Sequence, residues 1–217
     1  MSAEARLREQ ICLLAKSLYD RGLTPGSSGN ISARMEDGRL LVTPTGSCFG
    51  RLDPEGLSVL DAAGRHVSGA QPTKEVPLHS AFYETRPAQT GAVVHLHSTH
   101  SVALSLLPDT DPEDMLPPLT AYGIMKLGKV KLLPYFMPGD PAMGDAIRGL
   151  AGKRSAVVLA NHGPVVAGKD LEAAVYAMEE LEETSKLAIL TRGLAPRLLT
   201  EAEIRGLVTK FNVEWDD

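Results

Sequence analysis

Residues 155–160, with the sequence SAVVLA, restrict the fold more than any other segment of the chain. A strand this apolar belongs in the middle of a sheet that other layers cover on both faces. Strand-like and helix-like patterns alternate along the rest of the chain, which favours an α/β fold. A length of 217 residues also suits one domain of ordinary size. We therefore expect a single α/β domain over residues 1–217.

Hydrophobic spacing and turn residues divide the chain into its expected elements. Apolar residues from Leu7 to Leu18 repeat at helical spacing, and Gly22 follows as a helix end. Thr200 and Glu203 predict a capping box that begins the last helix. The other expected helices cover residues 75–86, 98–106, about 140–150, and 170–192. Expected strands cover residues 31–34, 40–43, 92–97 and 155–160, and the main loops cover residues 24–30, 44–74 and 107–121.

The charge balance limits the partners. The sequence has 22 Lys and Arg residues against 27 Asp and Glu residues, a formal net charge of −5, and no block of basic residues. Nucleic acids and anionic membranes attract proteins through clustered cations, so we expect neither as a partner. No apolar run reaches the roughly 18 residues that a membrane-spanning helix needs. Two isolated cysteines and the lack of a secretory signal pattern predict a cytoplasmic protein with reduced thiols.

His95 and His97 carry the sharpest chemical signal. Side chains alternate along a strand, so both imidazoles would project from one face of the expected strand and could bind one metal ion. His162 follows the apolar strand at residues 155–160, where α/β folds present functional groups. Three imidazoles leave a coordination position open, which is typical of catalytic zinc. The alternative is that His95 and His97 are ordinary, partly buried histidines.

The other histidines and Tyr122 fit less specific roles. We interpret His79 and His100 as supporting or structural residues rather than ligands, although His100 lies close to the pair in sequence. His66 falls in a turn and is expected to face solvent. Tyr122, expected in the loop before Met125, could orient or protonate an intermediate near a metal. It could equally pack its ring and leave its hydroxyl in water.

Glu75 and two loops could complete a site for an anionic substrate. A carboxylate beside a divalent metal can act as a general base or fill the open position until substrate arrives. Without a metal nearby, Glu75 is a solvated residue at a helix start. The loops GSSGN at residues 26–30 and TPTGS at residues 43–47 could turn several N–H groups and hydroxyls towards one phosphate. Each loop alone would be only a turn, but Thr73 and Lys74 beside Glu75 strengthen the case for a phosphate site.

These motifs occur in the order found in one known family. They are GSSGNIS at residues 26–32, TPTG at residues 43–46, Glu75, His95-Leu96-His97, and Asn161-His162-Gly163 with the long helix after it. The chain thus resembles the class II aldolase and adducin family from about residue 4 to residue 212. Within it, the segments PTKEVPLH, SCFGRLDP and VHLHSTHSVALS are similar to those of 3-oxo-tetronate 4-phosphate decarboxylases. The resemblance implies a three-layer α-β-α sandwich around a largely antiparallel sheet.

The resemblance also implies a set of functional residues. Its Zn²⁺ ligands would be His95, His97 and His162. Glu75 would be the acid or base, and could also bind the metal before substrate does. The implied phosphate contacts come from Gly29, Asn30, Thr45, Gly46 and Thr73. The family implies a homotetramer with active sites between subunits, which Tyr122 of a neighbouring chain reaches. Another divalent metal could replace zinc.

The chain departs from the sugar-phosphate aldolases of this family just before Glu75. Those enzymes typically carry two serines there, whereas this sequence has Thr73-Lys74. Lys74 adds a cation that suits a substrate carboxylate. The expected reaction is therefore the decarboxylation of 3-oxo-tetronate 4-phosphate to dihydroxyacetone phosphate and carbon dioxide, in the catabolism of four-carbon acid sugars. The alternatives are a class II aldolase or epimerase of the fuculose-phosphate or ribulose-phosphate type, and a non-catalytic adducin-like scaffold.

Overall fold

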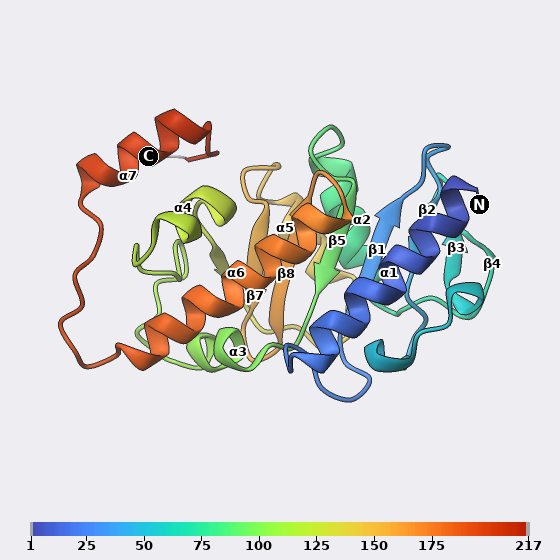
Figure 1. The fold of residues 1–217 in the computed structure, drawn as a ribbon, viewed down its shortest axis with the longest axis horizontal. Coiled ribbons are helices and arrows are strands. Elements are labelled where there is room, and N and C mark those ends of the chain that lie inside the picture. The colour runs from blue at the N-terminus through green and yellow to red at the C-terminus, as the bar shows by residue number, and fades with distance from the viewer. Residues whose placement is uncertain (1, 216–217) are drawn as a thin grey trace.

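A computed structural model describes residues 2–215 (Figure 1). Eight strands form one sheet in the order β4-β3-β2-β1-β5-β8-β7-β6. The strands are β1 (Asn30–Arg34), β2 (Leu40–Val42), β3 (Ser58–Leu60), β4 (His66–Ser68), β5 (Ala92–His95), β6 (Lys131–Leu133), β7 (Ala156–Leu159) and β8 (Gly163–Gly168). Within the described residues, every neighbouring pair is antiparallel except β6 and β7. The sheet is thus largely antiparallel, as the resemblance implies.

Seven α-helices surround or flank the sheet. They are α1 (Ala3–Asp20), α2 (Val76–Thr85), α3 (Thr99–Ser105), α4 (Ala121–Leu127), α5 (Ala142–Arg148), α6 (Leu171–Leu190) and α7 (Glu201–Phe211), counted over residues 2–215. Two short 3-10 helices, η1 (Phe49–Arg51) and η2 (Pro54–Gly56), lie between β2 and β3. Figure 1 shows α1 and α6 crossing one face of the sheet side by side.

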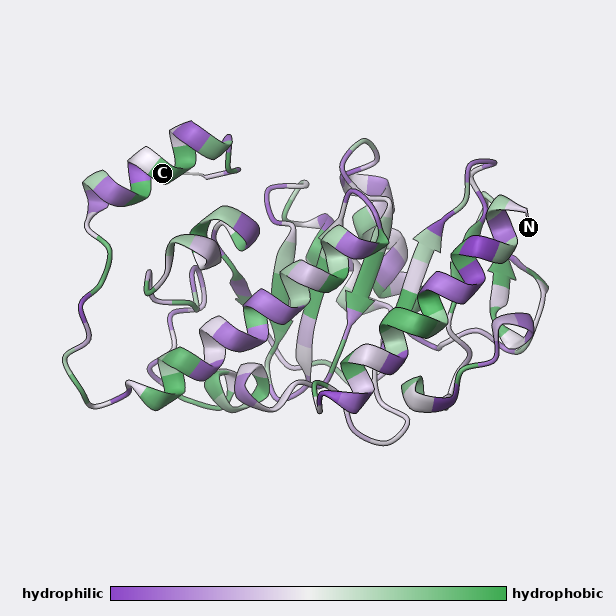
Figure 2. Cartoon of the chain, viewed as in Figure 1, coloured by the Kyte–Doolittle hydropathy of each residue, from purple (hydrophilic) through white to green (hydrophobic). Residues whose placement is uncertain are grey.

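The core is divided into two hydrophobic clusters by the sheet. One cluster joins apolar residues of α1 and α6 to alternate strand residues such as Ile31 and Val94. The other joins α2 and α5 to the intervening strand positions such as Val93 and Val165. Because side chains alternate along a strand, these two sets face opposite sides of the sheet. The chain is therefore the expected α-β-α sandwich, and hydrophobic residues dominate its central strands (Figure 2).

The long elements agree with the sequence pattern. Helix α6 lies within two residues of its expected bounds, and α1 contains the periodic residues from Leu7 to Leu18 and ends shortly before Gly22. Asp37-Gly38 forms the turn of the β1–β2 hairpin. The capping box at Thr200 and Glu203 begins α7 as predicted.

Several short elements were not predicted. Strands β3 and β4 interrupt the expected loop over residues 44–74, and β6 and β8 were also absent from the prediction. His66 lies in β4 rather than in a turn, although its side chain is exposed as expected. Strand β5 ends at His95, two residues earlier than expected. Strands of three residues show no periodicity of their own, and their pairing partners define them.

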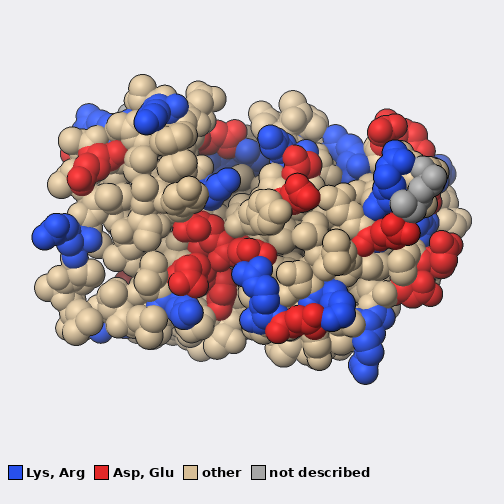
Figure 3. All heavy atoms as spheres, in the orientation of Figure 1, with Lys and Arg blue, Asp and Glu red and all other residues tan. Residues whose placement is uncertain are grey.

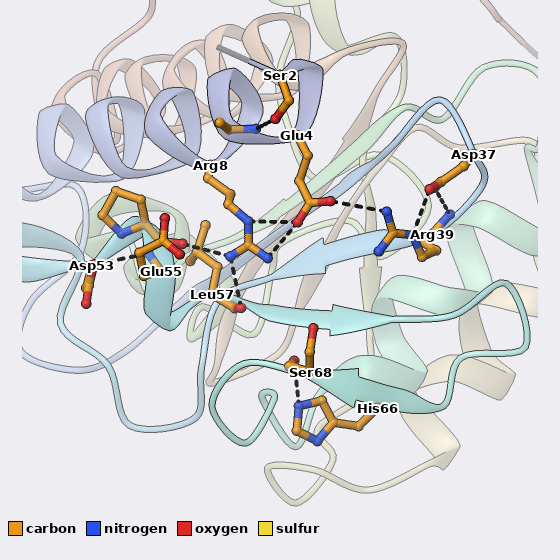
Figure 4. A network of polar contacts seen from close by, with 12 residues as sticks. Ser2, Glu4, Arg8, Asp37, Arg39, Asp53, Glu55, Leu57, His66 and Ser68 are labelled. Atoms are coloured by element: carbon orange, nitrogen blue, oxygen red, sulfur yellow. Dashed lines mark hydrogen bonds and ion pairs between the residues drawn. The ribbon is translucent and has the colours of Figure 1, made fainter.

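A polar network ties α1 to the far end of the sheet (Figure 4). Arg8 donates hydrogen bonds to the Glu4 carboxylate at 2.9 Å and to the carbonyl of Pro54 at 2.8 Å. Arg39 links the other Glu4 oxygen, at 3.1 Å, to Asp37 in the hairpin turn, at 2.7 Å. The hydrogen bonds from Arg8 hold the pKa of Glu4 below its ordinary value. This network anchors the N-terminal helix over β1 and β2.

Both signs of charge occur on the surface that α1 and α6 cover. Figure 3 shows acidic and basic side chains interspersed there, with acidic ones gathered over the middle of α6. The sequence of α6 places Glu179, Glu180, Glu182 and Glu183 in this region. Among the described helices, none combines the length and apolar character needed to cross a bilayer.

Candidate active site

The ends of several strands bring the predicted site residues to one edge of the sheet. The antiparallel register pairs Asn30 with His95, and His95 with Val165. The start of β1 therefore lies beside the end of β5, which in turn lies beside the start of β8. The segment after β2 reaches the same edge, because β2 runs antiparallel to β1. Loops 26–30 and 43–47 and all three predicted histidine ligands thus meet there.

His95, His97 and His162 form a compact cluster. The ring centroids of His95 and His97 are 5.0 Å apart, those of His95 and His162 are 4.9 Å apart, and those of His97 and His162 are 4.8 Å apart. One ligand nitrogen from each ring lies within 4.8 Å of the other two. His95 is fully buried and His97 is partly buried, although His97 follows the last residue of β5. The side chains still converge because the alternation of the strand continues through residue 97.

A tight turn between β7 and β8 places His162. Asn161 has a left-handed backbone, with φ at 59°, and its N–H donates to the Ser105 hydroxyl at 3.1 Å. Gly163, two residues after Asn161, approaches the backbone of Leu96 so closely that a Cβ atom would lie 2.1 Å from the Leu96 carbonyl oxygen. Only glycine fits this approach. The turn therefore holds His162 against the end of β5.

The nitrogen atoms of the cluster fit a metal ion. The Nδ1–H of His95 donates to the Pro164 carbonyl at 2.8 Å, so in the neutral ring Nε2 carries a lone pair. That nitrogen is buried without a hydrogen-bond partner, and so are both ring nitrogens of His162. Burial and the neighbouring histidines hold the pKa of His95 well below its ordinary value, and burial also lowers the pKa values of His97 and His162. The cluster is therefore neutral and rich in lone pairs, as metal binding requires.

Glu75 closes the cluster from the side of α2. Its Oε2 lies 3.4 Å from His95 Nε2, and its Oε1 lies 3.4 Å from His162 Nε2. Because the His95 nitrogen carries no proton, a carboxylate faces a lone pair at this distance, and a cation between them would relieve the repulsion. Glu75 is only 8% exposed, and Asn30 Nδ2 donates to it at 2.7 Å. Glu75 is thus a buried carboxylate beside the cluster rather than a solvated helix-start residue.

The predicted phosphate-binding segments lie side by side. Thr45 N–H donates to Gln71 O at 2.9 Å, and Thr73 N–H donates to Thr43 O at 3.3 Å. Thr45 and Gly46 are exposed, whereas Thr73 is nearly buried and accepts from the Glu75 N–H at 3.3 Å. Gly29, with φ at 85°, lies close to the His95 carbonyl. These segments converge next to Glu75.

Two predicted residues occupy environments that differ from a simple phosphate cradle. The side-chain amide of Asn30 bonds to Glu75 and to His79, so both of its polar atoms are already used within the protein. The Lys74 side chain is exposed and lies against Gly139, and no ion pair engages it within residues 2–215. Lys74 is therefore an exposed lysine beside Glu75 in the sequence, without an ion-pair partner among the described residues.

Tyr122 and the remaining histidines are not members of the cluster. Tyr122 belongs to helix α4 rather than to the expected loop, and its side chain is 60% exposed. His100 donates to Glu182 at 2.8 Å, which fits the structural role expected for it. His79 is buried and hydrogen-bonded to Asn30, as a supporting residue would be. His79 stands four residues after Glu75 on an expected helix, and this spacing was the sequence signal for a place near Glu75.

Comparison with known proteins adds independent information to this geometry. Residues 9–189 match the family described as the Class II Aldolase and Adducin N-terminal domain. The chain belongs to this family. The resemblance read from the sequence is thereby confirmed, and with it the identification of a lyase of the class II aldolase type.

Individual relatives cover almost the whole chain. A 3-oxo-tetronate 4-phosphate decarboxylase of Pectobacterium atrosepticum is 46% identical over 95% of this chain and 94% of its own length. An L-fuculose phosphate aldolase of Escherichia coli is 30% identical over 95% of this chain and 94% of its own length. The solved structure of YgbL from Escherichia coli superposes with a TM-score of 0.92 at 46% identity, covering 95% of this chain and 99% of that one. The fold therefore agrees with experimental structures of relatives.

Proposed function

We propose that this protein is a metal-dependent carboxy-lyase that converts 3-oxo-tetronate 4-phosphate into dihydroxyacetone phosphate and carbon dioxide. One contrast carries the proposal: over nearly the same length, the chain is 46% identical to a decarboxylase of this name and 30% identical to an L-fuculose phosphate aldolase. The unpaired Lys74 supports the same choice, because a keto acid adds a carboxylate that a sugar phosphate lacks.

The metal-binding role falls to His95, His97 and His162, and we propose Zn²⁺ as the physiological ion. Three imidazoles with an open position suit catalytic zinc, although other divalent metals bind imidazole as well. A metal ion held there would supply Lewis-acid stabilisation of the negative charge that builds on the substrate's keto oxygen. The backbone carbonyl of Pro164 holds His95 in the tautomer that leaves Nε2 available for such an ion.

The chemical step breaks the bond between the carboxylate carbon and the neighbouring carbon of the substrate. The electron pair left behind moves onto the keto oxygen, and one proton must then reach the carbon that lost carbon dioxide. Glu75 lies at the edge of the cluster, where its carboxylate could take up a proton from solvent and then deliver it to that carbon as a general acid. Tyr122 of an adjacent subunit is the second candidate, because the residue is 60% exposed in this chain.

Binding of the two anionic ends of the substrate is assigned to different groups. We propose that the phosphate lies against Gly29, Asn30, Thr45, Gly46 and Thr73. Since the Asn30 side chain is engaged with Glu75, its contribution would come from the backbone of the loop. Lys74 would hold the carboxylate until it leaves as carbon dioxide. Loop N–H groups and one unpaired cation thus provide attraction that the net charge of −5 does not reveal.

The proposed assembly comes from the family resemblance, and the proposed location comes from the cysteine content and the N-terminal sequence. We propose that residues 1–217 form one domain, consistent with the single sheet, and that four copies assemble with active sites between them. The exposed position of Tyr122 on α4 suits a residue that serves a neighbouring chain. We also propose a cytoplasmic location. Light scattering in solution would test the tetramer, and a monomer with full activity would contradict it.

A substrate assay decides between the decarboxylase and its rivals. Purified protein incubated with 3-oxo-tetronate 4-phosphate should release equal amounts of carbon dioxide and dihydroxyacetone phosphate. Activity on fuculose or ribulose phosphates alone would establish an aldolase or epimerase instead. A non-catalytic scaffold predicts no turnover and no bound metal, so metal analysis of the wild type and of His97→Ala addresses that alternative. We expect near-stoichiometric divalent metal in the wild type and its loss from His97→Ala.

A further inference from the structure

A line of buried polar side chains leads from Glu75 into the interior between β1 and α2. Asn30 and Ser32 come from β1, and His79 and Tyr83 come from α2. Ser32 is completely buried, and the exposed fractions of Asn30, His79 and Tyr83 are 5%, 1% and 7%. Burying so many polar groups is unfavourable unless every one is hydrogen-bonded. Their arrangement therefore needs an explanation beyond packing.

Each side chain in the line contacts the next. Asn30 Nδ2 lies 2.7 Å from Glu75 Oε2, and Asn30 Oδ1 makes a short contact with His79 Nε2. On the other side of the imidazole, Ser32 Oγ lies 2.7 Å from His79 Nδ1. The Tyr83 hydroxyl lies 2.9 Å from Ser32 Oγ. The line is thus continuous from the Tyr83 hydroxyl to the carboxylate of Glu75.

The Glu75 carboxylate at one end and the neutral ring of His79 in the middle fix the direction of every hydrogen bond. A carboxylate only accepts, so Asn30 donates through Nδ2 and must accept through Oδ1. His79 then carries its proton on Nε2, and Nδ1 accepts from the Ser32 hydroxyl. Ser32 in turn accepts from Tyr83. All donors point towards Glu75, and His79 is held in one tautomer.

Both aromatic members of the line are neutral. Burial is the largest cause that lowers the pKa of His79, to about 3, and burial raises the pKa of Tyr83. The Arg34 guanidinium covers the Tyr83 ring at 4.8 Å and closes the outer end of the line. The carboxylate of Glu75 therefore rests on a neutral, fully satisfied network, which constrains its orientation.

We propose that His79, Ser32 and Tyr83 are positioning residues that act through Asn30 to hold the Glu75 carboxylate in place for proton transfer. The inference rests on the acid–base role given to Glu75 in the proposed function. A carboxylate that lies 3.4 Å from two histidine nitrogens could otherwise rotate freely towards the metal position. The Asn30 amide holds one carboxylate oxygen, and the residues behind it hold the amide.

Two amide substitutions at His79 separate positioning from packing. The side-chain amide of His79→Gln reaches the position of Nε2 and can still donate to Asn30, whereas that of His79→Asn reaches only the position of Nδ1. We expect His79→Asn to lower kcat by roughly 10–100-fold with little change in KM, as substitutions behind a functional residue commonly do. His79→Gln should retain most of the wild-type kcat. Equal kcat values in two folded variants would overturn the proposal.

Readouts that need no substrate keep this test separate from the proposed function. The ¹⁵N chemical shifts of His79 in the wild type should report a neutral ring protonated at Nε2. In crystal structures, the contact of Glu75 with Asn30 should survive in His79→Gln and be lost in His79→Asn. A wild type that does not decarboxylate the keto acid would defeat the proposed function, while these two measurements would still decide the arrangement. A different tautomer, or an unchanged contact in both variants, would overturn it.

Tyr83→Phe provides a second route if the His79 variants do not fold. It removes one hydroxyl at the far end of the line and leaves the ring in place. We expect shifted ¹⁵N signals for His79 and a smaller loss of kcat than in His79→Asn. Unchanged His79 signals in Tyr83→Phe would show that the line is not coupled and would overturn the proposal.

Discussion

The imidazole of His95 donates a hydrogen bond of 2.8 Å to the backbone carbonyl of Pro164. Proline has no N–H and is unusual inside a sheet, yet β8 lies between β5 and β7 and contains it. Its carbonyl accepts from His95 and from the N–H of Leu96 at 3.1 Å. The contact turns His95 Nε2 towards the other two histidines. A backbone carbonyl thus determines which nitrogen of His95 keeps a lone pair for the cluster.

Gly163→Ala should disturb the cluster without touching a histidine. The new methyl group would lie 2.1 Å from the Leu96 carbonyl oxygen and 3.2 Å from His97 Cα, so the turn would have to move. We expect a loss of stability of ~1–3 kcal/mol, typical of overpacking, together with weaker metal binding. Thermal unfolding and metal titration would measure both effects. Gly206→Ala in α7 is the control, since no atom lies within 4 Å of its Cβ position; equal effects of the two substitutions would contradict this account.

Glu75→Gln should separate metal binding from proton transfer. The substitution keeps the size of the side chain but removes the carboxylate, and general acid–base groups contribute roughly 10²–10⁴-fold to rate. We therefore expect kcat to fall by about that factor while the three histidines retain the metal. Steady-state kinetics and metal analysis provide the comparison. Glu84→Gln changes an exposed glutamate of α2 that pairs with Arg148 and should behave like the wild type; normal turnover by Glu75→Gln would remove Glu75 from the mechanism.

The sequence predicted the long helices and the most apolar strand of this fold better than its shorter or irregular elements. Helix α6 and the strand at Ala156–Leu159 have strong hydrophobic patterns, so their type and place were clear. Strand β8 begins with Gly163-Pro164, a pair that ordinarily signals a turn, and only the neighbouring strands β5 and β7 make it a strand. Helix α4 is seven residues long and contains Gly123, so its local signal was too weak.

The histidine cluster was more predictable than the groups that support it. His95 and His97 share a face through strand alternation, and His162 follows a separate strand. The direction of a polar side chain in a loop carries no such periodic signal. Asn30 lies in a loop motif typical of phosphate binding, but tertiary packing turns its amide towards Glu75 and His79. The orientation of the Asn30 amide depends on how β1 packs against α2. The sequence of the loop alone does not determine that packing.

Lys74→Ser tests whether the unpaired cation selects an acid substrate. Hydrogen bonds to charged groups contribute ~1.5–3 kcal/mol, so we expect KM for the keto acid phosphate to rise by roughly 10–100-fold. Metal content should not change, because Lys74 is not one of the proposed metal ligands. Lys169→Ser is the matched control, since this exposed lysine follows the opposite end of β8. An unaltered KM in Lys74→Ser would mean that Lys74 only faces solvent.

Asp114→Asn should change the pH dependence of stability. Asp114 lines a cavity of about 80 Å³ that α4 and α7 border, and it accepts from the Val130 N–H at 3.3 Å. Burial is the main cause that raises its pKa from 3.8 to about 6. Between these values the native state binds more protons than the unfolded state, so the fold loses stability as pH rises from 3.8 to about 6 and keeps this penalty at higher pH.

The amide should remove this penalty and still accept from Val130. At pH 7.5 we expect Asp114→Asn to unfold at a higher temperature than the wild type, by an amount equivalent to ~1 kcal/mol after solvent screening of a partly exposed group. Well below the ordinary pKa of 3.8 the two proteins should unfold at the same temperature, because Asp114 is then protonated in both states. Asp145→Asn, at an exposed position on α5, is the control. A difference that persists at low pH would assign the effect to packing rather than to the charge of Asp114.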